Sequence, residues 1–185
     1  PFISKVYACT ILLFGITIIL KNRNKNNEVL YAVAYLIGSE VFLRVTKGNP
    51  NYEFAKYGTI LLVLLGGYFE GMSKKSLPYK IFILLLIPSI LITIDTLDFA
   101  TIKSKIAFDI SGPICLGLCS IYTYKKKISI NEINTIILTI GLPIISLCSY
   151  LFFKSPISHI DLRCTESNFK LSGDFGPNQV ATILG

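Results

Sequence analysis

The chain has 185 residues, of which 52% are hydrophobic and 16% are charged. Soluble domains carry about 25% charged residues, so the composition argues against a soluble globular enzyme. The high hydrophobicity also excludes a disordered chain. The formal net charge is +7. On so apolar a chain we attribute this excess to the positive-inside bias of membrane proteins, and we expect no nucleic-acid partner.

Long apolar stretches separated by clumps of charge are the main feature of the sequence. A bilayer core of about 30 Å is crossed by about 20 apolar residues in a helix. We predict spans at 1–20, 29–45, 57–72, 77–97, 106–124 and 133–153, with a seventh starting near Gln179. Backbone groups in hydrocarbon must be hydrogen-bonded within their segment, so these stretches predict helices. The predicted fold is all-α: a polytopic transmembrane bundle of about six spans plus the start of a seventh.

The distribution of Lys and Arg predicts the orientation. The first, third and fifth connections hold nine of these residues, and the second and fourth hold five. The excess places the odd connections in the cytoplasm and residues 154–178 outside, as an external loop before a truncated seventh span. Because the chain begins with Pro1 and stops at Gly185 inside an apolar run, we expect residues 1–185 to be a single transmembrane domain from a longer protein.

Charged residues inside predicted spans usually face protein or water. Glu40 and Arg44 are four residues apart and can form an ion pair on one helix. That pair either stabilises the helix or faces substrate. Asp109 follows Lys105 by four residues, and a local ion pair is the simplest interpretation. Glu70 lies near the cytoplasmic boundary, where we expect it to be solvated.

Metal chemistry has little support in the sequence. The chain has five cysteines and a single histidine, His159, and contains no CxxC motif. Four of the cysteines lie in apolar stretches, where a thiol usually serves packing. One histidine cannot build a multi-histidine metal site. We therefore predict no metal and no cofactor.

Two polar segments are candidates for a site on the outer side. Residues 46–56, TKGNPNYEFAK, mix charges with aromatic rings, so they either anchor the chain at the interface or form the edge of a cavity. Near the end of the chain, Gly176 and Pro177 predict a turn followed by a helix start. Such a start offers free N–H groups to an anion such as a diphosphate, although an ordinary capped helix is the alternative.

The run 165–168, TESN, followed by 176–180, GPNQV, resembles the O-antigen ligase/polymerase-related membrane proteins, in their Bacteroidota-like branch. The segments 52–57, YEFAKY, and 111–113, SGP, resemble patterns of the same branch. The resemblance implies a polytopic, metal-independent glycosyltransferase of the bacterial inner membrane. It would move a glycan from undecaprenyl diphosphate to a lipid A–core or glycan acceptor at the periplasmic face.

The leaving diphosphate in such a reaction needs cations or N–H donors. In this family the candidate base lies later in the chain, past Gly185, so we assign no catalytic residue here. A polysaccharide polymerase of the same fold and a non-enzymatic transporter of lipid-linked glycan remain alternatives. We expect the substrate-binding residues to be Arg44, Lys56, Arg163, Glu166, Asn178 and Gln179.

Overall fold

The computed structural model describes residues 2–71, 73, 75–96, 99–154, 172 and 176–184, with the side chains of 89–107 outside the description. Within these residues the chain is helical and has no strand, which confirms the all-α prediction. The described helices are α1 (Phe2–Asn22), α2 (Glu28–Val45), α3 (Phe54–Glu70), α4 (Leu77–Thr96), α5 (Phe99–Thr123), α6 (Ile130–Lys154) and α7 (Pro177–Leu184).

The helix boundaries follow the apolar stretches closely, with one clear exception. The helix α5 begins at Phe99, seven residues before the predicted start at Ile106. The sequence prediction tracked hydrophobicity, whereas a helix can continue through polar residues such as those at 101–105. The proline predicted to open the last helix, Pro177, is indeed its first residue.

Two described helices, α1 and α6, are long and apolar enough to cross a membrane by length and composition. The described apolar parts of α4 and α5, Leu77–Pro88 and Phe108–Thr123, are shorter. The helix α3 has only 17 residues, and α2 includes three charged side chains. Two of the six predicted spans therefore have this direct support.

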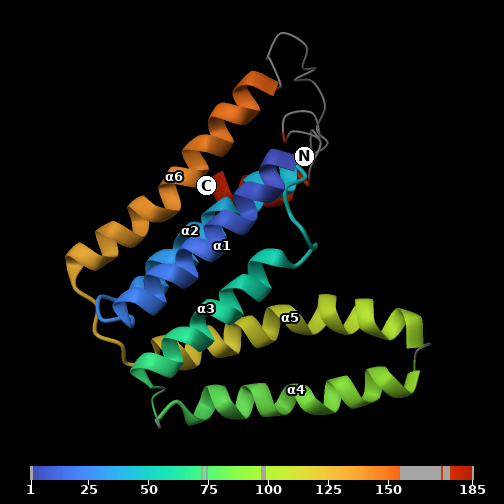
Figure 1. Ribbon diagram of the computed structural model, residues 1–185. Coiled ribbons are helices and arrows are strands. Elements are labelled where there is room, and N and C mark those ends of the chain that lie inside the picture. Colours follow the sequence, from blue (N-terminus) through green and yellow to red (C-terminus); the bar gives the residue numbers. More distant parts are fainter. Residues whose placement is uncertain are drawn as a thin grey trace.

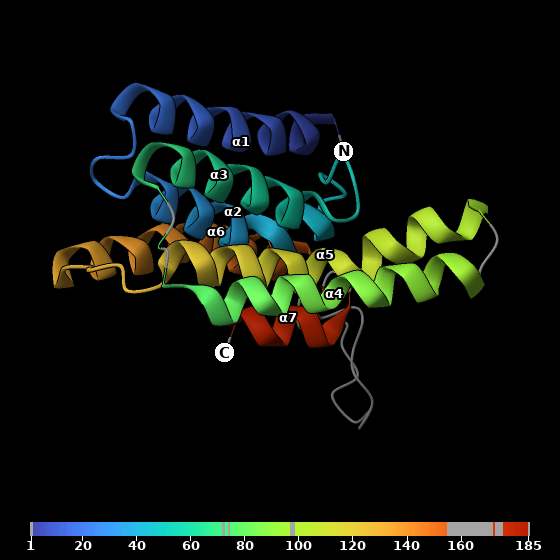
Figure 2. The ribbon, with the colours of Figure 1, turned by 90° about the horizontal axis from the view of Figure 1, so that it is seen from below.

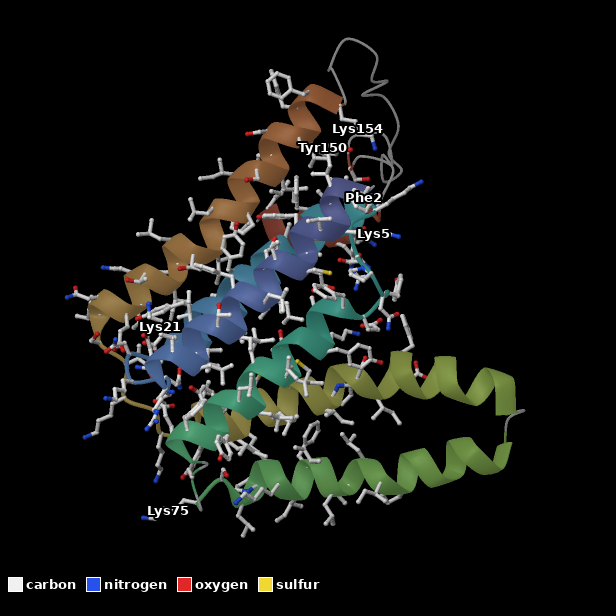
Figure 3. All side chains as sticks on the ribbon, in the orientation of Figure 1. Phe2, Lys5, Lys21, Lys75, Tyr150 and Lys154 are labelled. Carbon is white, nitrogen blue, oxygen red and sulfur yellow. The ribbon has the colours of Figure 1, made fainter. Side chains whose placement is uncertain are left out.

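The central element of the bundle is α2, which packs against α1, α3 and α6 (Figure 1). The helices α4 and α5 form a hairpin that joins the rest through contacts between α5 and α3 (Figures 1 and 2). The α1–α2, α3–α4 and α5–α6 connections lie at one end of the bundle, and the α2–α3 turn lies at the other. Figure 3 shows Lys21 and Lys75 at the first end and Lys5 and Lys154 at the second.

Two apolar clusters hold these helices together. The larger one joins α1, α2, α3 and α5, with Leu36 and Leu62 almost completely buried. The second joins α2, α6 and α7 through Val41, Leu147 and Val180. This second cluster positions the short α7 beside α2, which matters for the site described below.

A hydrogen-bonded network ties the ends of α3 and α5 to the α1–α2 turn. The hydroxyl of Tyr122 donates to Glu70 Oε2 at 3.0 Å, and Lys126 forms an ion pair with the same carboxylate. The side chain of Asn24 is fully buried and donates to Tyr122 Oη at 2.7 Å. Glu70 is exposed, as the sequence predicted, and helix packing also brings it partners 52 and 56 residues away that the sequence did not indicate.

Candidate functional site

A cavity of about 360 Å³ opens at the end of the bundle that carries the α2–α3 turn. Four segments of the chain contribute to its wall: α2, the turn into α3 with the first turn of that helix, α5 and α7. The lining residues are Glu40, Val41, Arg44, Tyr52, Glu53, Lys56, Phe108, Gln179, Thr182 and Ile183. Three of the six predicted substrate-binding residues, Arg44, Lys56 and Gln179, thus share one cavity.

On the α2 side of the cavity, Arg44 is held by an acid and an aromatic ring. Its Nη2 and Nε atoms lie 2.6 Å and 3.0 Å from Glu40 Oε1. Its guanidinium carbon lies 4.5 Å from the centre of the Tyr52 ring, a cation–π distance. The Arg44 side chain is only 9% exposed. The predicted Glu40–Arg44 pair is confirmed, and the guanidinium keeps further N–H donors for a ligand.

A second ion pair forms at the start of α3. Lys56 Nζ lies 2.6 Å from Glu53 Oε2, donates to Ser111 Oγ at 3.5 Å, and lies 5.7 Å from the centre of the Phe108 ring. The Glu53 side chain is 6% exposed. The ammonium meets this carboxylate off hydrogen-bonding geometry, so neither Glu53 oxygen has a hydrogen-bond partner among the described residues. Glu53 Oε2 is therefore held by the ion pair with Lys56, and Glu53 Oε1 is a buried acceptor without a partner among the described residues.

The helix α7 supplies the amide of Gln179 to the same cavity. Val180, the next residue, is buried in the second apolar cluster and fixes the helix in place. Asn178 is exposed and lies outside the cavity lining. The N–H groups of Gln179 and Val180 both donate to the carbonyl of Gly176. Those two donors are therefore used within the chain, as in an ordinary capped helix.

The charge balance of the described lining is less basic than a site for a leaving diphosphate, which needs cations or N–H donors, would suggest. Each cation, Arg44 and Lys56, has an acid beside it, so the described lining has no formal net charge. Acids and an amide next to aromatic rings can hydrogen-bond the hydroxyls of a ligand while the rings cover its apolar faces. Two of the predicted substrate-binding residues, Arg163 and Glu166, lie outside the described residues.

The sequence analysis did not assign Tyr52 and Glu53 to the site. It placed both in the segment 46–56 and left open whether that segment is an interface anchor or a cavity edge. The structure makes Tyr52, Glu53 and Lys56 part of the cavity wall. The three-residue spacing between Glu53 and Lys56 was the available signal, since it allows an ion pair. Nothing in the sequence indicated that the Glu53 carboxylate is buried.

Other candidate groups contribute less. Among the described residues, no group of three or more His, Cys, Asp or Glu side chains could hold a metal ion. The described thiols of Cys9, Cys115, Cys119 and Cys148 are free. The proposed Lys105–Asp109 pair cannot be placed, because the Lys105 side chain lies outside the described part of the chain.

No protein-family model, curated protein or solved structure matches the chain. A function therefore has to be proposed from the chemistry of the cavity and from the resemblance of the sequence.

Proposed function

We propose that the chain is the bundle of a multi-pass membrane protein, with α1 to α6 as spans and α7 as the start of a seventh. The exposure of the two most apolar helices supports this. In both α1 and α6 only 17% of the most apolar window is buried, which favours lipid-facing helices over the core helices of a soluble protein. Phe14, Leu138 and Phe153 are 68%, 69% and 83% exposed. Apolar surface of this extent needs a lipid or protein cover.

The orientation that we propose follows the positive-inside rule. The bundle end that carries Lys21 and Lys75 would face the cytoplasm, because the odd connections hold more Lys and Arg. The cavity, at the opposite end, would then open on the periplasmic side of the bacterial inner membrane. In this orientation the segment 154–178 would be on the periplasmic side as well.

We infer that the protein is an O-antigen ligase-like glycosyltransferase that moves a glycan from undecaprenyl diphosphate to a lipid A–core or glycan acceptor. The observation that carries this proposal is the meeting of Arg44, Lys56 and Gln179 at one cavity, although they come from three separate helices. The acceptor hydroxyl would attack the anomeric carbon and give its proton to the base expected past Gly185, and the diphosphate would leave with the electron pair of the broken glycosyl–oxygen bond. The free N–H groups of Arg44 suit the leaving group, since charge-assisted hydrogen bonds strengthen as negative charge develops.

Neighbouring residues of α7 provide a matched test of this cavity. Gln179 lines it and Asn178 does not, and both are amides in the first turn of the same helix. We would measure glycan transfer in cells that depend on the protein, divided by its abundance in the membrane fraction. Arg44→Lys keeps the charge and removes the planar fork of donors. A lost charge-assisted contact of roughly 1.5–3 kcal/mol corresponds to about ten- to a hundredfold in rate.

The expected result is a loss of transfer with Arg44→Lys and Gln179→Ala at normal abundance, and little change with Asn178→Ala. Full transfer by the first two variants would exclude this cavity from the site. A loss that merely follows abundance would leave both residues with a structural role. The products also separate the two enzyme classes: a ligase attaches chains of normal length to the acceptor, whereas a polymerase determines chain length.

A further inference from the structure

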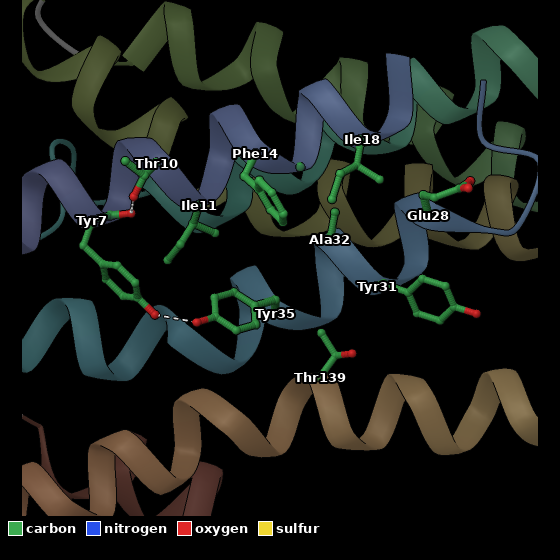
Figure 4. A pocket seen from close by; sticks show the side chains of 11 residues that line it. Tyr7, Thr10, Ile11, Phe14, Ile18, Glu28, Tyr31, Ala32, Tyr35 and Thr139 are labelled. Atoms are coloured by element: carbon green, nitrogen blue, oxygen red, sulfur yellow. Dashed lines mark hydrogen bonds between the residues drawn. The ribbon is translucent and has the colours of Figure 1, made fainter. Parts of the chain in front are cut away.

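A second cavity, of about 450 Å³, lies between α1, α2 and α6 (Figure 4). Its lining on α1 recurs at steps of three and four residues, at Tyr7, Ile11, Phe14 and Ile18, so it is a groove along one face of that helix. At one end the hydroxyls of Tyr7 and Tyr35 are joined by a hydrogen bond of 2.6 Å. Satisfying both hydroxyls in this way leaves the middle of the groove apolar.

The same face of α1 continues into a cluster of cations. Lys21 and Asn22 follow Ile18 by three and four residues, so they extend the groove beyond its apolar part. Together with Arg23 and Lys25, and with Asn26, they line an open surface pocket of about 400 Å³. No acid among the described residues forms an ion pair with any of these three cations. The apolar groove therefore ends at three cations that outnumber the single acid, Glu28, in its lining at that end.

The turn that carries these cations is fixed rather than loose. Its central residue, Asn24, is fully buried and bonds both Tyr122 Oη and the backbone N–H of Val29. Arg23 and Asn24 adopt left-handed backbone angles, with φ of 52° and 55°. Such angles are uncommon outside glycine and persist here because the buried asparagine holds the turn. The side chains of Arg23 and Lys25 are thereby presented to solvent.

The length of the groove matches one leaflet of a bilayer. Tyr7 and Ile18 are eleven residues apart in the sequence. At a rise of 1.5 Å per residue this separation is about 16 Å. Half of a hydrocarbon core of about 30 Å is close to the same length. A lipid chain lying in the groove would therefore have its phosphate near the cations of the turn.

We propose that the groove and the turn 21–25 bind one anionic glycerophospholipid of the leaflet at the lysine-rich end. One acyl chain lies between α1 and α6, and the phosphate lies against Lys21, Arg23 and Lys25. Glu28 lies at this end of the groove (Figure 4) and has one buried carboxylate oxygen without a hydrogen-bond partner among the described residues. Because that oxygen is buried, the headgroup preference comes from the three cations, which favour an anionic lipid such as phosphatidylglycerol over zwitterionic ones. The site rests on the membrane placement proposed above and is independent of glycan transfer.

Lipid retention tests the proposal. The protein would be purified from membranes in mild detergent and exposed to equal amounts of phosphatidylglycerol, phosphatidylethanolamine and phosphatidylcholine. Native mass spectrometry would then measure the mass of the protein with its bound lipid. Wild type should retain one phosphatidylglycerol in preference to the other two. Replacing all three cations by Gln should lower this preference by about tenfold or more, since each cation near an anionic headgroup contributes to binding. The matched control replaces three cations of the same end, Lys75, Lys125 and Lys127, by Gln.

A second pair of variants tests the groove itself. Thr139→Trp fills the groove from α6, and Leu138→Trp adds the same ring at an exposed neighbouring position outside it. We expect the first to lose the bound lipid and the second to keep it. Equal retention of all three lipids by wild type would overturn the proposal, and so would full retention by Thr139→Trp. Recovery of the wild-type protein outside membranes would refute both the lipid site and the membrane placement. Loss of the bound lipid from Thr139→Trp together with normal glycan transfer would support the lipid site alone.

Discussion

Gly38 of α2 lies directly against the backbone of Ile140 of α6. A Cβ atom placed on Gly38 would lie 2.7 Å from the carbonyl oxygen of Ile140 and 3.2 Å from its Cα. No side chain separates the two helices at this point, so they are as close as their backbones allow. Small residues that permit such an approach are typical of helix contacts in membranes, where packing replaces the hydrophobic drive.

We predict that Gly38→Ala destabilises the bundle although alanine is the better helix former. The added methyl meets backbone atoms, which cannot move as a side chain can, and overpacking typically costs about 1–3 kcal/mol. The measurement is the thermal unfolding midpoint in detergent. Gly141→Ala is the control, because a Cβ there meets nothing within 4 Å. A midpoint for Gly38→Ala that equals or exceeds that of the control would contradict the close approach.

The Glu40–Arg44 pair should appear as an energetic coupling. Both side chains are partly buried, at 27% and 9% exposed, so removing one leaves the other short of a partner. We expect the loss of unfolding free energy in the double alanine variant to be smaller than the sum of the single losses by about 0.5–3 kcal/mol. A double-mutant cycle in detergent measures this difference. Strictly additive losses would mean that the pair contributes nothing to stability.

The hydroxyl of Tyr122 should contribute to the stability of the bundle. Tyr122→Phe removes the partner of the buried Asn24 amide and a donor to Glu70. An unsatisfied buried polar group costs about 1–3 kcal/mol, so we expect unfolding at a clearly lower temperature. Tyr68→Phe serves as the control, since Tyr68 is 83% exposed. Equal midpoints for the two variants would show that the network adds no stability.

The proposed orientation predicts which side of the membrane each end can be labelled from. Single cysteines would replace Asn26 and Asn178, both exposed, in a background without the five native cysteines. Asn24, in the same turn as Asn26, is unsuitable for labelling because its side chain is fully buried. In intact cells an impermeant thiol reagent should modify position 178, and position 26 should react only after permeabilisation. The reverse pattern would mean that the cavity faces the cytoplasm.

Features that depend on residues close together along the chain could be predicted from the sequence. Apolar runs predicted the seven helices, the four-residue spacing predicted the Glu40–Arg44 pair, and Pro177 marked a helix start. Each of these is set within one helix, where the 3.6-residue repeat fixes which side chains meet. The early start of α5 was missed because hydrophobicity does not report a helix that continues through polar residues.

The helix faces that meet could not be predicted in this way. The rotation of each helix about its axis, and its choice of neighbours, depend on contacts summed over the whole bundle. That summation brought Glu70 to Tyr122, buried Asn24 and Glu53, and placed Gln179 beside Arg44. Spacing along the chain contains no information about such pairs, because Glu70 and Tyr122 are 52 residues apart and Arg44 and Gln179 are 135 residues apart.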